Sequence, residues 1–248
     1  MLIVRSSLAS RNAWMVIFSG FFEPLFFLVA MGQGLGSLVG PVAGPAGQPL
    51  TYAAFIAPGL LAASAMNGAV YDSTFGFFLK LKYAKLYDAV LATPLGPADV
   101  AVGEIGWGLI RGGMYSAGFL AVMLALGLIS SPWALLALPA ALFVALAFAS
   151  IGIAATSFMR SWQDFDLVQL AVLPMFLFSA IFFPLSVYPP ALQWLVQVFP
   201  LYHAVALMRG LTTGVVGWSM LADVAYFAVL AVFGVAVASR RLQALLLR

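Results

Sequence analysis

Residues 112–159 read GGMYSAGFLAVMLALGLISSPWALLALPAALFVALAFASIGIAATSFM and contain no charged side chain. This stretch is more than twice the roughly 20 residues that one helix needs to cross the apolar core of a bilayer. It must therefore fold back on itself, and the short link Ser130-Ser131-Pro132 offers a turn near its middle. Residues 24–71 and 167–208 also lack charged side chains and also exceed the length of one span.

The composition of the whole chain supports a membrane protein. Of its 248 residues, 64% are hydrophobic and 8% are charged, and the mean hydropathy is +1.09. Soluble domains carry about 25% charged residues, because they need a polar surface. The net charge of +3 does not indicate nucleic-acid binding here, since most Lys and Arg residues lie beside predicted span ends. The absence of cysteine excludes disulfides and Cys-ligated metals.

The hydropathy pattern predicts an all-α, polytopic membrane protein with a single domain over residues 1–248. Six spans are expected near 14–36, 52–72, 101–127, 133–158, 166–184 and 218–239. An interfacial helix is expected at 1–13, a cytoplasmic coupling region at 74–100 and an outer re-entrant hairpin at 185–213. With both termini in the cytoplasm, nine of the eleven Lys and Arg residues lie on the cytoplasmic side, as the positive-inside bias favours.

The segment before the last span has an alternative interpretation. Residues 191–208 are apolar enough for a seventh span, but Pro189, Pro190 and Pro200 interrupt the segment. A seventh crossing would also place Arg240, Arg241 and Arg248 outside. A re-entrant hairpin on the outer side, packed on its own bundle, fits the charges better.

Catalytic motifs are missing from the sequence. No phosphate-binding loop of the form Gly-x-x-x-x-Gly-Lys-[Ser/Thr] occurs, and no glycine is followed by lysine. His203 is the only histidine, so a His-Glu-x-x-His zinc site cannot form, and no Gly-x-Ser-x-Gly motif is present. We therefore do not expect an enzyme, a metal site or a bound cofactor in this chain.

Glu23 and Arg111 lie deep inside predicted spans. Each is about ten residues from the cytoplasmic end of its span, which corresponds to roughly 15 Å at 1.5 Å per residue. A charge at such depth costs at least about 2.5–3.5 kcal/mol. We therefore predict that Glu23 and Arg111 pair across spans one and three, either as a structural clasp or beside a substrate path.

The link between spans two and three has an amphipathic pattern. Charged residues alternate with apolar ones from Lys80 onward, and Pro94 should end the helix. The alternating residues are Lys80, Lys82, Lys85 and Asp88 among Leu81, Tyr83, Leu86, Val90 and Leu91. The helix either lies on the membrane surface or docks a cytoplasmic partner.

The predicted outer hairpin contains His203 and Arg209. A lone histidine is more often a hydrogen-bonding side chain than a metal ligand. Arg209 is expected to extend to the outer surface, and Asp223, early in the last span, is a possible partner.

Several short motifs occur in a characteristic order along nearly the whole chain. They are Glu23-Pro24-Leu25-Phe26-Phe27-Leu28 running into Gly32–Gly36, Tyr52–Ser64 with Pro58-Gly59, Leu91-Ala92-Thr93-Pro94-Leu95, Phe183-Pro184-Leu185, Pro200-Leu201-Tyr202-His203 and Arg209-Gly210. In order and spacing, the sequence resembles the type-2 ATP-binding-cassette exporter permeases, and among them the nodulation lipo-oligosaccharide and daunorubicin-type branch.

The resemblance implies the same six spans, interfacial helix and outer hairpin in a cell (inner) membrane. It also implies a dimer of permeases, expected to be a homodimer, with two cytoplasmic ATPase subunits that hold ATP and Mg. The cargo would be an amphiphile, such as a glycolipid, lipo-oligosaccharide or hydrophobic drug. The coupling helix would include Lys80, Lys82, Lys85, Leu86, Asp88 and Thr93. Many members have Gly-Thr-Glu where this chain reads Leu86-Tyr87-Asp88.

Two other functions remain open at this stage. An ion-coupled secondary transporter would use Glu23 and Arg111 in an ion relay. A non-transporting membrane assembly subunit would show no response to cargo.

Overall fold

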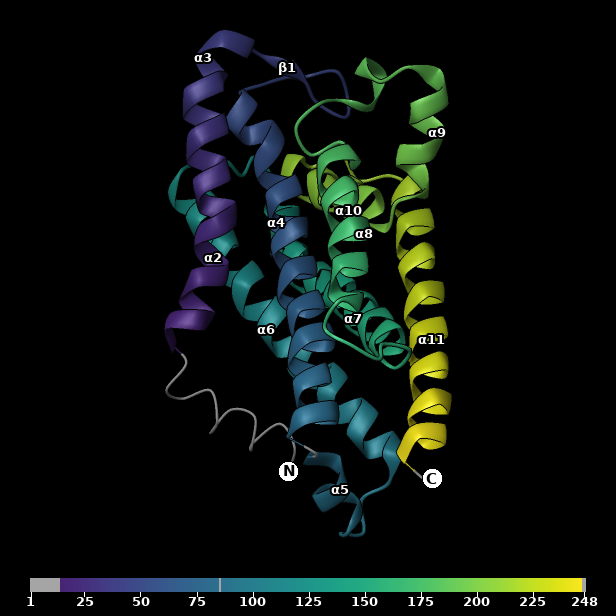
Figure 1. Ribbon diagram of the computed structural model, residues 1–248. Coiled ribbons are helices and arrows are strands. Elements are labelled where there is room, and N and C mark those ends of the chain that lie inside the picture. The colour runs from purple at the N-terminus through teal and green to yellow at the C-terminus, as the bar shows by residue number, and fades with distance from the viewer. Residues whose placement is uncertain (1–13, 85, 247–248) are drawn as a thin grey trace.

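A computed structural model describes residues 14–84 and 86–246 of the chain. It is a bundle of long helices (Figure 1). Helix α2 (Trp14–Val29) begins in the lower half of this view. Helix α11 (Ser219–Leu246) ends at the lower end of the bundle, and the short helix α5 (Leu86–Leu91) lies just below it. The upper end holds β1 (Val42–Ala43) and α9 (Pro190–Val198). The helix predicted at 1–13 and the residue Lys85 lie outside the described residues.

The remaining elements follow in chain order. They are η2 (Ala30–Leu35), α3 (Gly36–Val39), β2 (Pro49–Leu50), α4 (Tyr52–Tyr71), η3 (Asp72–Gly76), η4 (Leu79–Tyr83), α6 (Pro97–Ala125), η5 (Pro132–Leu136), α7 (Ala137–Thr156), α8 (Asp164–Phe178), η6 (Leu185–Val187) and α10 (Pro200–Thr213). Among the described residues, five helices are long and apolar enough to cross a membrane, or six if the bent pair α9 and α10 counts as one span. The predicted all-α, polytopic fold is confirmed, with β1 and β2 as a minor antiparallel pair.

Small residues let the central helices approach closely. Helix α4 is buried along most of its length and packs against α2, α6, α7 and α10. A Cβ atom added to Gly68 of α4 would lie 2.9 Å from the Gly112 Cα of α6, and one added to Gly112 would lie 2.9 Å from the Ala65 carbonyl oxygen. Close backbone contact of this kind is a main source of helix association in lipid, where apolar burial drives little.

The second span is longer than the sequence analysis predicts. Helix α4 continues through the π-helical turns η3 and η4 as far as Tyr83. Lys80 and Lys82 therefore belong to the end of this span and not to a separate coupling helix, which corrects the predicted boundary. The separate helix α5 has only six residues, and Thr93 lies in the turn that follows it, before Pro94. Two π-helical turns carry the long helix past the predicted break, a feature that hydropathy does not report.

The fifth predicted span is shorter than expected. Helix α8 has 15 residues, about 22 Å at 1.5 Å per residue, against an apolar core of about 30 Å. It ends at Phe178, and the chain then runs without a helix until η6. Helices α9 and α10 follow with an 88° bend between them. Pro200 explains the bend, because it lacks the backbone N–H that would continue α9 and it restricts Phe199 to an extended conformation.

Candidate functional site

Arg111 is buried and pairs with an acidic residue of the second span. Its Nε atom lies 2.8 Å from Asp72 Oδ2, and both residues are less than 10% exposed. The guanidinium also lies 5.8 Å from the centre of the Tyr71 ring. The predicted partner Glu23 is therefore wrong: Glu23 is exposed, and Asp72 at the start of η3 compensates the charge. A buried Arg111 does need a nearby carboxylate. The predicted second span ends at residue 72, and for that reason Asp72 did not stand out as a buried partner.

A second ion pair lies next to the first on the same two helices. Lys80 Nζ donates to Glu104 Oε2 at 2.6 Å, and Glu104 is almost fully buried. Glu104 and Arg111 are seven residues apart on α6, so they lie on the same helix face. The seven-residue spacing is visible in the sequence. It places Glu104 on the face of the helix that carries Arg111, and it is the signal that could have identified Glu104 as a buried partner for Lys80.

Arg209 is buried, not extended to the surface as predicted. Its guanidinium donates to the carbonyl oxygens of Phe55 (3.2 Å), Ala180 (2.9 Å) and Ile181 (3.4 Å). It also lies 4.0 Å from the centre of the Phe55 ring. Ala180 and Ile181 belong to the non-helical segment after α8, whose carbonyls have no helical partners. Non-helical backbone inside a membrane protein must be satisfied by other protein groups, and Arg209 supplies the donors.

His203 and Asp223 form a polar contact between α10 and α11. His203 Nδ1 lies 2.7 Å from Asp223 Oδ1, and Nε2 lies 2.9 Å from the Gln197 carbonyl oxygen at the end of α9. The imidazole ring stacks on Tyr226 at 4.2 Å between ring centres. His203 thus acts as a hydrogen-bonding side chain that joins three helices, and Asp223 partners His203 and not Arg209.

A polar cleft of about 390 Å³ lies between α2, α4 and α8. Glu23 of α2, Asn67 of α4 and Gln169 of α8 line it, together with Tyr71 and Thr74. The remaining lining is mostly aromatic or aliphatic and includes Phe75, Trp162, Phe165 and Phe176. Several of these rings contact one another: the Trp162 ring centre lies 5.4 Å from that of Phe75 and 5.6 Å from that of Phe165.

The cleft has the chemistry of a binding site for a polar but uncharged or cationic group. A carboxylate, two amides and hydroxyls in a mainly apolar cavity can orient a ligand by hydrogen bonds, and aromatic faces can cover its apolar parts. The depth of Glu23 in its predicted span marks it as a candidate from the sequence, whereas Asn67 and Gln169 carry no charge and no sequence signal marks them. Within the described part of the chain, no cluster of three His, Asp or Glu side chains suited to a metal ion occurs.

The predicted coupling residues that the structure describes lie in and around α5. Lys82 in η4 and Thr93 in the turn after α5 are exposed, and Leu86 is half-buried. Tyr87 and Val90 of α5 are buried, and the Tyr87 ring lies 5.5 Å from that of Phe77 in the second span. Helix α5 is thus fixed to the bundle through its apolar face. Asp88 lies within the helical backbone of α5.

Comparisons with known proteins agree with this architecture. A family model described as ABC-2 type transporter matches residues 1–212. Nodulation protein J from Rhizobium leguminosarum bv. trifolii is 33% identical over 193 residues, which make up 77% of this chain and 72% of that protein. Nodulation protein J from Rhizobium leguminosarum bv. viciae is 32% identical over 207 residues (83% and 78%). Inner membrane transport permease YadH from Escherichia coli (strain K12) is 28% identical over 216 residues (86% and 79%). The chain therefore belongs to the ABC-2 type transporter family, as a multi-pass membrane permease.

Proposed function

We propose that this chain is one of two identical permease subunits of an ATP-driven exporter, and that the polar cleft is part of its transport path. The observation that carries the proposal is the convergence of Glu23, Asn67 and Gln169 from three helices on one intramembrane cavity. Polar side chains inside a membrane are costly and are usually functional. A cavity lined by them, with an aromatic wall, suits an amphiphile that exposes hydroxyl or amide groups.

The ATP would be hydrolysed by separate cytoplasmic subunits, since the chain has no phosphate-binding loop. Helix α5 is the proposed contact with these subunits. Its buried residue Tyr87 packs on Phe77, which follows η3, the turn that holds Asp72. A displacement of α5 would therefore reach the Asp72–Arg111 pair through packed side chains, and this path supports a coupling role. The end of the bundle that holds α5 would face the cytoplasm.

The site and the family resemblance support an amphiphile as the cargo class. A lipo-oligosaccharide or glycolipid has a hydroxyl-rich head that fits the cleft, and hydrophobic drugs with amine or amide groups share part of this chemistry. Nodulation protein J of two Rhizobium leguminosarum biovars, both similar to this chain along most of their lengths, supports a search among lipo-oligosaccharides first.

The test is ATP-dependent export from vesicles that contain the permease and the ATPase subunit that co-purifies with it. Fluorescent lipo-oligosaccharide should be exported only with ATP, and an ion gradient alone should not drive it. Replacing both Lys85 and Asp88 by alanine should uncouple ATP hydrolysis from export. The matched control replaces one exposed acidic and one exposed basic residue outside the coupling region, Asp166 of α8 and Arg240 of α11, by alanine. Gradient-driven export by the chain alone would refute the proposal in favour of a secondary transporter.

A further inference from the structure

We propose that the groove between α7 and α8 is an acyl-chain subsite, which holds the aliphatic tail of an amphiphile while the polar head lies in the polar cleft. This inference rests on the proposed function and adds the placement of the cargo. The occupant is one aliphatic chain covalently attached to a hydroxyl- or amide-bearing head.

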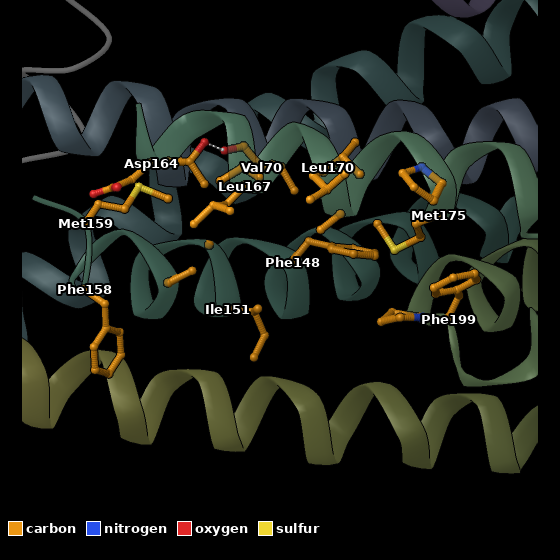
Figure 2. Close-up of a pocket in the computed structure, with 18 of the residues that line it drawn as sticks. Val70, Phe148, Ile151, Phe158, Met159, Asp164, Leu167, Leu170, Met175 and Phe199 are labelled. Atoms are coloured by element: carbon orange, nitrogen blue, oxygen red, sulfur yellow. Dashed lines mark hydrogen bonds between the residues drawn. The ribbon is translucent and has the colours of Figure 1, made fainter. Parts of the chain in front are cut away.

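The groove is larger and far less polar than the cleft. Its volume is about 920 Å³, near the upper end of the roughly 300–1,000 Å³ that is usual for ligand pockets. In Figure 2 the labelled side chains of α8 and Phe148 lie between the ribbons of α8 and α7, whereas Ile151 and Phe158 extend from α7 toward α11. Apolar residues along most of its length include Phe148, Ile151, Leu167, Leu170, Met175 and Phe199.

The length of the groove matches one leaflet of a bilayer. It runs along α8 from Asp164 to Met175, eleven residues on, and this corresponds to about 16 Å at 1.5 Å per residue. One leaflet contributes about half of the 30 Å apolar core. Arg160, Ser161 and Asp164 form the polar end of the groove at the α7–α8 link, and Phe199 lies at the other end. The groove therefore starts at an interface and extends inward, as a lipid chain does.

The groove and the polar cleft share one wall. Val70 and Thr74 of the second span, and Val168 and Val172 of α8, line both cavities. Glu23, Asn67 and Gln169 line only the cleft, and the groove beyond these four residues is apolar except at its Arg160–Asp164 end. A molecule with a polar head and an aliphatic tail can occupy both cavities, whereas a purely polar or purely apolar molecule leaves one of them without a matching group.

Helix α8 is packed lightly enough for a chain to pass this shared wall. Met175 is the one residue of α8 that is buried, and the other residues of the helix are exposed or half-buried. By contrast, α4 is buried along most of its length. Separation of α8 from Val70 and Thr74 thus disrupts few contacts. Because an aliphatic chain gains little on leaving lipid for protein, the groove would orient the tail and contribute little affinity.

The test therefore maps position and not affinity. The permease, with its ATPase partner, is placed in phospholipid nanodiscs and exposed to dodecyl maltoside that carries a diazirine either at the chain end or on the saccharide. The chain-end probe should label groove residues such as Ile151 or Leu170, and the saccharide probe should label cleft residues such as Asn67 or Gln169. A fatty acid with the same photoreactive chain and no saccharide should label the groove several-fold less.

Filling the groove should remove the chain-end label. Ala155 and Ala171 are exposed residues that line the groove, so Ala155→Phe and Ala171→Phe occupy its space without disturbing a packed core. Each variant is expected to lower chain-end labelling several-fold and to leave saccharide labelling of the cleft unchanged. Ala236→Phe, an exposed alanine of α11 that lines neither cavity, is the matched control and should behave as the parent protein.

Three results would overturn the subsite. One is chain-end labelling outside the groove while the saccharide labels the cleft, a result that leaves the proposed function intact. Another is equal labelling of the groove by the headless fatty acid, undiminished by excess dodecyl maltoside, which makes the groove a general lipid site. The last is loss of saccharide labelling together with absence of ATP-driven export, a result that rejects the proposed function and the subsite with it.

Discussion

The two buried arginines are equally exposed, at 8%, but they are compensated in opposite ways. Arg111 lies beside one carboxylate, Asp72, on a neighbouring long helix. Arg209 has no carboxylate within ion-pair distance in the described chain and donates instead to three backbone carbonyls. One arginine therefore neutralises another charge, and the other replaces hydrogen bonds that a broken helix has lost.

This difference predicts which arginine can be replaced, together with its partner, without destabilising the fold. An ion pair in the interior can be replaced as a unit by apolar side chains, because both charges disappear together. Backbone carbonyls cannot be removed by substitution, so the need for the Arg209 donors remains in every variant. Apolar side chains could thus replace the charge pair between the second and third spans. The non-helical segment after α8, by contrast, needs the hydrogen-bond donors of Arg209.

Arg111→Met should have the largest effect. It leaves the Asp72 carboxylate buried without compensation, a change that costs about 3–5 kcal/mol in comparable cases. The free energy of unfolding, measured by SDS titration in mixed micelles, should fall by that order. The double variant with Asp72→Leu should recover most of the loss, and additive losses would refute the coupling of the two residues. Arg111→Met combined with Glu23→Gln serves as the control that should not recover stability.

Arg209→Met should have the next largest effect, because carbonyls of the buried segment after α8 lose their donors. Unsatisfied buried acceptors cost about 1–3 kcal/mol. Arg209→Lys should lose less, since an ammonium group can donate to some of the same oxygens but lacks the planar fork. The same SDS titration measures both variants. Hydrogen exchange at residues 179–183 should rise in Arg209→Met, and unchanged exchange there would contradict the supporting role.

These results also mark how far the sequence could predict the fold. The uncharged stretches predicted the long helices, and Pro189, Pro190 and Pro200 predicted an interruption before the last span. The early end of α8 at Phe178 was not predictable, because Ser179 to Phe183 are as apolar as a membrane helix. The carbonyl of Ala180 is bonded instead by Arg209, 29 residues further along the chain, and hydropathy does not report such a tertiary contact.

The candidate site was predicted only in part, for a related reason. Depth along a helix can be counted from the sequence, and it identified Glu23 and Arg111. Rotation about the helix axis decides which side chains meet, and two π-helical turns alter that rotation just where Asp72 and Lys80 lie. Hydropathy therefore located the charges but could not assign Asp72 to Arg111 or Lys80 to Glu104.

Lys80→Met should have a smaller effect than either arginine substitution. Glu104, which is 4% exposed, loses its partner, but the 25% exposure of Lys80 shows that water can approach the contact. We therefore expect the unfolding titration to show a loss at the low end of the about 1–3 kcal/mol that an unsatisfied buried group costs. Lys82→Met is the matched control, because Lys82 is exposed two residues away and has no ion pair in the described chain. Equal losses in the two variants would show that the Lys80–Glu104 contact contributes nothing specific.

Glu23→Gln should have the smallest effect on stability and a clear effect on transport. Glu23 is exposed and the structure gives it no ion pair with a described residue, so its neutralisation should change the free energy of unfolding by less than about 0.5 kcal/mol. Its carboxylate nevertheless lines the polar cleft, where the amide introduced by the substitution would donate as well as accept hydrogen bonds.

The rate of ATP-driven export should therefore change in Glu23→Gln while the Arg111 pair stays intact. Asp166→Gln is the matched control, because Asp166 is an exposed acidic residue in the first turn of α8 that does not line the cleft. A stable Glu23→Gln variant with unaltered export would exclude the carboxylate from the path. A loss of stability as large as that of Arg111→Met would instead show that Glu23 stabilises the fold. Glu23 would then belong with the structural charges Asp72 and Arg111 and not with the residues that contact cargo.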